Sequence, residues 1–149
     1  MNRQPLSAED EKLVAAAVAA VTQPISQIEG VRPAQVGAAL RLDSGEIITS
    51  LNLIADVHSI SMCAEPQAIA QANRQPQRKI EAIVAVYHLP GHAPRVISPC
   101  GRCREVITDF AGQGSVILRD PGSEALYKVP AGDLLPLKYR DYWQGDDLI

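Results

Sequence analysis

The first run of apolar positions predicts a helix that begins after Ser7 and extends to about Val21. Ser7 followed three residues later by Asp10 is a variant of the capping box, which satisfies the free N–H groups at a helix start. The alanine-rich run that follows has high helix propensity. Pro24 ends the predicted helix, because proline lacks the N–H group that a helix interior requires.

Further along the chain, the hydrophobic pattern predicts five strands and two more helices. Two of the strands flank the turn sequence Asp43-Ser44-Gly45 and are expected to form a hairpin. The run IEAIVAVY is continuously apolar, which is typical of a strand that is covered on both faces. The predicted strands are Val36–Leu42, Glu46–Leu53, Ile80–Tyr87, Val116–Leu118 and Ala125–Val129, the predicted helices are Ala64–Asn73 and Gly101–Phe110, and Leu89–Arg95 is an expected exposed loop.

This order of elements predicts an α/β fold. Strands that alternate with helices after an initial hairpin favour a mixed sheet, here of roughly five strands, with helices packed against it. The chain has 149 residues, 46% of them hydrophobic, which suits one domain with one hydrophobic core. Since no internal repeat and no linker interrupts the pattern, we expect a single domain over residues 1–149.

The charge of the chain narrows the range of partners. The formal net charge is −3 at pH 7, whereas proteins that bind a phosphate backbone usually present a strongly basic face. The longest apolar stretch, Leu13–Val21, is too short for a bilayer, and the acidic residues before it are unlike a signal peptide. We therefore expect a soluble, cytoplasmic protein whose partner is neither a membrane nor a nucleic-acid polymer.

The three cysteines of the chain form a pattern that is typical of metal binding. Cys63, Cys100 and Cys103 each lie near the expected start of a helix. Free N–H groups and a partial positive charge at a helix N-terminus stabilise thiolates over thiols. Three thiolates that converge at such a place would make a good zinc site.

The number of ligands indicates which kind of zinc site this is. A structural site normally has four protein ligands, whereas a catalytic site has three and leaves the fourth position to water. His58, His88 or His92 could supply a fourth ligand, although none has a spacing that requires it. An open, catalytic site is the simpler interpretation.

Glu65 follows Cys63 by two residues and is the candidate catalytic residue. A carboxylate there can take a proton from zinc-bound water and deliver it to a leaving amine. Cys-Ala-Glu followed by Pro-Cys-Gly-Arg-Cys is the three-cysteine variant of the motif of zinc deaminases. The pattern therefore predicts hydrolytic deamination of a base-like ring, with release of ammonia.

With these motifs, the chain resembles the cytidine deaminase superfamily, in particular its small, three-cysteine, homotetrameric members. The resemblance also covers Gln35–Leu40, the turn Asp43–Ile47 and the segment Leu134–Pro136. It implies a three-layer α/β/α sandwich, one Zn²⁺ per subunit and a free nucleoside as substrate. It also implies that Asn52 binds the ribose and that the backbone N–H of Ala64 helps to hold the base.

Three positions depart from the family pattern. Ile54 stands where the ribose-binding motif Asn-x-Glu has its glutamate, Ala34 replaces an aromatic residue, and Pro66 replaces an arginine that offsets thiolate charge. Arg102 or Arg104 could take over the role of that arginine. The departures predict the same chemistry on a changed substrate, and the aromatic tail that contains Trp143 resembles that of blasticidin-S deaminases.

Other interpretations of these residues stay open at this stage. The chain could be a non-catalytic zinc-binding member of the fold with a binding or regulatory role. Asn52 could be a turn or cap residue, His58 a surface histidine, and Trp143 either a pocket lid or part of a subunit interface. Retention of Glu65 favours the deaminase.

Overall fold

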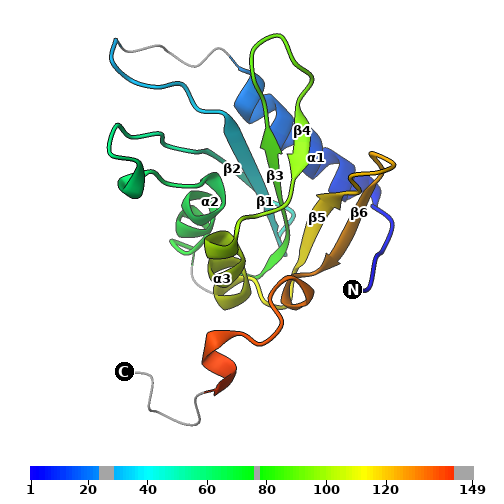
Figure 1. The fold of residues 1–149 in the computed structure, drawn as a ribbon. Coiled ribbons are helices and arrows are strands. Elements are labelled where there is room, and N and C mark those ends of the chain that lie inside the picture. Colours follow the sequence, from blue (N-terminus) through cyan, green and yellow to red (C-terminus); the bar gives the residue numbers. More distant parts are fainter. Residues whose placement is uncertain (24–28, 76–77, 143–149) are drawn as a thin grey trace.

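The computed structural model describes residues 1–23, 29–75 and 78–142 (Figure 1). Its centre is a mixed sheet with the strand order β2-β1-β3-β5-β6, in which β4 also pairs with β3. The strands are β1 (Val36–Leu42), β2 (Ile47–Leu51), β3 (Ile80–Tyr87), β4 (Arg95–Ile97), β5 (Ser115–Arg119) and β6 (Leu126–Pro130). The helices are α1 (Ala8–Thr22), α2 (Ala64–Ala72) and α3 (Gly101–Phe110), with short 3-10 helices at His58–Ile60, Ala131–Leu134 and Tyr139–Tyr142.

The sheet is mixed because one of its neighbouring pairs is parallel. β1 pairs antiparallel with both β2 and β3, β5 pairs antiparallel with β6, and β3 and β5 run parallel. The predicted mixed sheet and its five strands are thus confirmed. β4 was not expected, because a three-residue strand at the end of a loop leaves no period in the sequence. The second strand is shorter than predicted and ends at Leu51.

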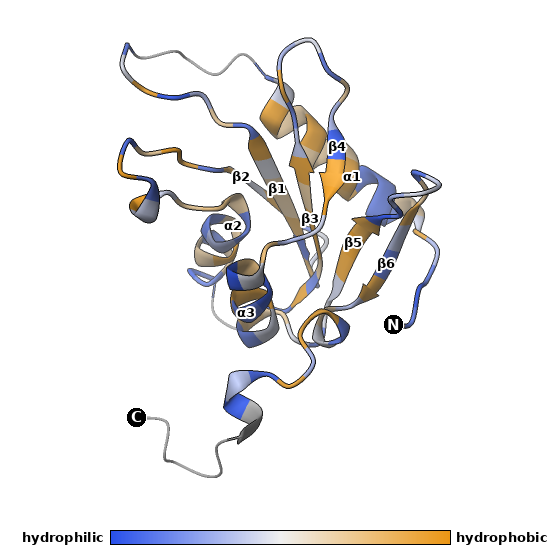
Figure 2. Cartoon of the chain, in the orientation of Figure 1, coloured by the Kyte–Doolittle hydropathy of each residue, from blue (hydrophilic) through white to orange (hydrophobic). Residues whose placement is uncertain are grey.

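Helices cover both faces of the sheet, so the fold is the expected three-layer α/β/α sandwich (Figure 1). One apolar cluster lies between α1 and the sheet, and a second lies between the sheet and the pair α2 and α3. Ala82, Val84 and Val86 of β3 belong to the first cluster, whereas Ile83 belongs to the second. Alternate residues of β3 thus face opposite layers, which explains its continuous apolar run (Figure 2).

Helix α1 packs unusually close to the sheet because small residues line the contact. A Cβ atom on Gly37 would lie 2.9 Å from the Ala17 carbonyl oxygen and 3.0 Å from Cβ of Val21. Any larger residue at position 37 would therefore push the helix away from β1. No helix in the described ranges is long and apolar enough to cross a membrane.

A buried carboxylate on α1 forms ion pairs with two strands of the sheet, β1 and β6. The capping box predicted at the helix start is present, with Ser7 and Asp10 hydrogen-bonded to each other. Asp10 is fully buried, and its carboxylate accepts bonds from Arg41 on β1 at 3.0 Å and from Lys128 on β6 at 2.6 Å. Burial raises the pKa of Asp10, but bonds from Lys128, Ser7 and Arg41 lower it overall, from 3.8 to about 2.

We expect Asp10→Asn to lower the free energy of unfolding at pH 7 by about 2 kcal/mol, because the ion pairs with Arg41 and Lys128 are lost. Since the folded-state pKa lies below the unfolded one, this stability is present above about pH 4 and is lost as the pH falls toward 2. The difference between wild type and variant should therefore shrink over that range. Urea unfolding at several pH values measures it.

The matched control is Glu9→Gln, which removes the exposed ion pair between Glu9 and Lys12 on the same helix. An exposed pair contributes at most about 1 kcal/mol, so the control should unfold close to wild type. An equal loss of stability in both variants would contradict the role given to Asp10.

Candidate active site

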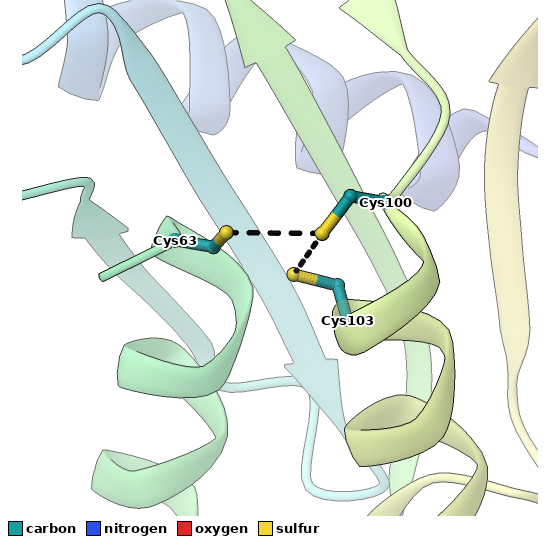
Figure 3. Close-up of side chains that lie close together, drawn as sticks. All are labelled: Cys63, Cys100 and Cys103. Carbon is teal, nitrogen blue, oxygen red and sulfur yellow. Dashed lines mark hydrogen bonds between the residues drawn. The ribbon is translucent and has the colours of Figure 1, made fainter. Parts of the chain in front are cut away.

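Three cysteine side chains from two helix N-termini meet on one face of the sheet (Figure 3). Cys63 is the N-cap of α2, Cys100 is the N-cap of α3, and Cys103 lies in the first turn of α3. The sulfur atoms of Cys63 and Cys100 are 3.9 Å apart, and those of Cys100 and Cys103 are 3.5 Å apart. The three sulfurs thus form one compact group, as the sequence predicted.

The spacing of these sulfurs fits a tetrahedral zinc ion. Zn–S bonds of about 2.3 Å place two sulfur ligands of a tetrahedral ion about 3.8 Å apart. All three sulfurs lie within 4.8 Å of one another, and no histidine or carboxylate of the described residues joins the group. Three protein ligands and an open fourth position are typical of a catalytic zinc site.

The surroundings of the thiols favour a bound cation. Burial, followed by the negative charge of Glu65, raises the pKa of the Cys103 thiol, and burial also raises the pKa of Cys63. Burial acts in the same direction on Cys100, but the backbone N–H and thiol of Cys103 lower its pKa overall. The thiols of Cys63 and Cys103 therefore favour the protonated form on their own, and a cation between the three sulfurs would stabilise the thiolates. The N-termini of α2 and α3 add dipoles that act in the same direction.

Glu65 is the buried carboxylate of this site. It is the second residue of α2, is 4% exposed and lines the same pocket as Cys63 and Cys100. Among the described residues, no hydrogen bond or ion pair engages its carboxylate, so both oxygens are available to a substrate or a water molecule. This arrangement places an acid–base group beside a metal site with an open coordination position.

The chain matches known proteins over most of its length. Residues 7–119 match the family described as the cytidine and deoxycytidylate deaminase zinc-binding region. A blasticidin-S deaminase of Bacillus cereus is 36% identical over 138 residues, which are 90% of this chain and 94% of that protein. The chain belongs to the cytidine deaminase family. A cytidine deaminase of Mycobacterium tuberculosis is 31% identical over 101 residues, 68% of this chain and 69% of that protein.

Solved structures agree with this assignment. The crystal structure of cytidine deaminase from Burkholderia pseudomallei has a TM-score of 0.67 and 27% identity, and covers 90% of this chain and 100% of that one. That of Bacillus anthracis has a TM-score of 0.73 at 21% identity, with coverage of 89% and 90%, and supports the fold alone. Together with the three-cysteine site, these matches make the chain a zinc-dependent deaminase, a hydrolase of C–N bonds in cyclic amidines.

A pocket of about 290 Å³ opens beside the cysteines of this deaminase. It brings together Glu65, two of the three cysteines and Asn52, all of which were candidate site residues. Its lining consists of Val36, Asn52, Leu53, Ile54, Ser61, Met62, Cys63, Glu65, Ile97, Ser98 and Cys100.

Asn52 has a structural role at the edge of this pocket. Its side-chain oxygen accepts hydrogen bonds from the backbone N–H groups of Gln35 at 2.8 Å and Val36 at 2.9 Å. Asn52 thereby holds the start of β1 against the end of β2. These two bonds agree with the alternative that Asn52 is a turn or cap residue. Binding of a ribose by Asn52 stays a prediction.

The other candidate residues lie in different surroundings. Ala64 is the first residue of α2 and is fully buried, and its carbonyl oxygen accepts a 2.7 Å bond from Ser50 Oγ. His58 is exposed, lies 3.4 Å from an Arg32 nitrogen and does not line the pocket, in line with a surface histidine. Trp143 lies outside the described residues.

Two polar side chains, Gln67 and Arg104, hold the backbone around the site through contacts that were not predicted, although Arg104 was a candidate to offset the thiolate charge. Gln67 Nε2 donates to the carbonyl oxygens of Leu51 at 2.6 Å and Cys63 at 3.2 Å. Arg104 donates to the backbone oxygens of Pro99 and Leu134 and to Ser98 Oγ, so it fixes the backbone before Cys100. The position of Gln67 four residues after Cys63, on the same helix face, was the available signal.

We expect Cys103→Ala to lower the zinc content of the purified protein from near stoichiometric to a small fraction, because two thiolates cannot replace the three-sulfur site. Metal analysis by atomic absorption measures the content. Met62→Leu is the control, because Met62 directly precedes Cys63, is exposed, and does not belong to the three-cysteine cluster. Stoichiometric zinc in the Cys103 variant would refute the assignment of this ligand.

Proposed function

We propose that the protein hydrolyses the exocyclic amine of a free 4-aminopyrimidine nucleoside, of the cytidine or blasticidin-S type, to a carbonyl. The observation that carries this proposal is the placement of the buried Glu65 in one pocket with Cys63 and Cys100. The names of the relatives, which include a blasticidin-S deaminase and cytidine deaminases, support this class of substrate.

Each part of the site has a distinct task in this reaction. Cys63, Cys100 and Cys103 hold the zinc ion, which when bound supplies a water molecule polarised for attack near neutral pH. Glu65 accepts a proton from the attacking water and returns protons to the ring nitrogen and to the departing amine. One water is consumed, the C–N bond breaks, a carbonyl forms and ammonia leaves.

The N–H groups at the start of α2 complete the proposed site. Ala64 is the first residue of the helix, so its N–H has no partner within the helix. The carbonyl oxygen of the same peptide group, that of Cys63, accepts a 3.2 Å bond from Gln67 Nε2, which holds the orientation of this peptide. We propose that the Ala64 N–H donates to the base and so orients the ring carbon toward the metal.

Four further properties belong to this proposal. They are one zinc ion per subunit, a homotetramer, a cytoplasmic location, and a single catalytic domain over residues 1–149 that acts on neither membranes nor nucleic-acid polymers. The alternative of a non-catalytic zinc protein is not retained, because the named relatives are deaminases and the three thiols leave a ligand position open.

We expect Glu65→Gln to lower kcat by about 10²- to 10⁴-fold, because the amide cannot accept the proton of water. The variant should keep its zinc, since the three sulfurs are unchanged. Ammonia release from a panel of cytidine, deoxycytidine, cytosine and blasticidin S measures the activity.

Glu11→Gln is the matched control, because Glu11 is an exposed glutamate on α1, on the opposite face of the sheet. This control should release ammonia at the wild-type rate. Activity of the zinc-loaded wild type that survives in Glu65→Gln would remove Glu65 from the mechanism. Silence of the wild type on the whole panel would refute the proposed substrate class.

The homotetramer has its own test. Large apolar side chains are exposed on the segment 53–62, at Leu53 and Met62, which line the pocket, and at Val57 and Ile60. Patches of this kind mark contacts between proteins. We expect sedimentation velocity to give about four times the monomer mass, and Ile60→Asp to shift the protein toward smaller species. A wild-type monomer at micromolar concentration would refute the tetramer.

A further inference from the structure

The connection between β4 and α3 is short, and it ends at a cysteine of the sulfur cluster. Residues 98–100 alone separate the two elements, and the last of them is Cys100. The Cys100 sulfur lies 3.9 Å from that of Cys63 and 3.5 Å from that of Cys103 (Figure 3). Whatever holds this connection therefore determines whether the three sulfurs close around one metal ion.

The guanidinium group of Arg104 holds this connection in place. Its Nε donates to the Pro99 carbonyl oxygen at 3.0 Å, and its Nη2 donates to Ser98 Oγ at 3.1 Å. Its Nη1 donates to the Leu134 carbonyl oxygen at 3.3 Å. Leu134 ends a 3-10 helix and is buried in the apolar cluster that also contains Ile107 of α3. One side chain thus fastens the connection to a buried segment 30 residues further along the chain.

These contacts require the shape of an arginine side chain. Three nitrogen atoms of one planar group reach three separate acceptors, and all three acceptors are oxygen atoms rather than sulfur atoms. A lysine carries the same charge, but its donors sit on one nitrogen atom at the end of a flexible chain. A single ammonium group cannot span the same three oxygens, so the contacts depend on geometry as well as on charge.

We propose that Arg104 is a positioning residue for Cys100, which fixes the place of that sulfur in the cluster and slows the release of zinc. It acts through the shape of its guanidinium group rather than through its charge. Cys100 is the exposed member of the three cysteines, so its sulfur is the one that most needs support from the backbone. Partners outside the ligand set commonly change metal affinity by about 10- to 100-fold. The inference concerns the zinc site of the proposed deaminase and rests on that function.

The experiment measures how fast the zinc-loaded protein transfers its zinc to an excess of the chelator pyridylazoresorcinol. We expect Arg104→Lys, which keeps the charge and loses the fork, to release zinc about 10- to 100-fold faster than the wild type. Arg74→Gln is the control, because Arg74 is exposed and follows the end of α2 that is remote from Cys63. It should release zinc at the wild-type rate. The wild-type rate in Arg104→Lys would overturn the inference, because charge would then be sufficient.

The visible absorption spectrum of the Co²⁺-loaded protein gives a second readout, which a general loss of stability would not move. The bands of a bound Co²⁺ ion depend on the positions of its ligands. We expect these bands to shift in Arg104→Lys and to stay in place in Arg74→Gln. An unchanged spectrum of Arg104→Lys would overturn the positioning role.

A milder variant keeps the inference testable if Arg104→Lys does not fold. Ser98→Ala removes one acceptor of the guanidinium group, and Ser98 is exposed, so the core is untouched. We expect zinc release about two- to tenfold faster than in the wild type, as for the loss of one hydrogen bond. Release at the wild-type rate would overturn the inference. No readout uses a substrate, so such a failure leaves the proposed function intact, whereas failure of that function would show as silence on the substrate panel.

Discussion

The site depends on one constraint: the N-termini of α2 and α3 must lie close enough together to bring three cysteine sulfurs into one cluster. Cys63 and Cys100 cap these two helices, and Cys103 lies one turn into α3. Both helices lie on the same face of the sheet and share one apolar cluster, in which Ile69 of α2 and Ile107 of α3 are buried. Because each helix contributes at least one ligand, a bound metal ion joins the two helices while the sheet holds them in register.

Helix α1 supports the site from the opposite face of the sheet. It contributes no candidate site residue, yet it packs on the reverse side of β1 and β3. Its close approach at Gly37 and the buried Asp10 bind it to β1 and, through Lys128, to the distant strand β6. A shift of α1 would therefore move β1, whose first residue, Val36, lines the pocket.

The sequence was sufficient to predict the elements with strong local signals and the chemistry of the site. The capping box, the apolar run of β3 and the two cysteine motifs each act over a few residues, and the structure contains all of these elements. Strand β4 and the bridge between Leu53 and Met62 could not be predicted, because both are too short to leave a repeating pattern in the sequence. The bonds of Asn52 to Gln35 and Val36 join residues 17 and 16 positions apart, and no local pattern indicates them.

These differences separate two parts of the site with different physical origins. The three cysteines and Glu65 lie at helix starts, where backbone dipoles and core packing fix them. Leu53 and Ile54, which line the same pocket, lie on an irregular segment that backbone bonds between Leu53 and Met62 hold in place. Those bonds involve no side chain, so the backbone of this segment depends little on which side chains it carries. The two parts of the pocket are therefore under different constraints, since a change at a helix start alters the sulfur cluster, whereas a change on the segment alters the pocket wall.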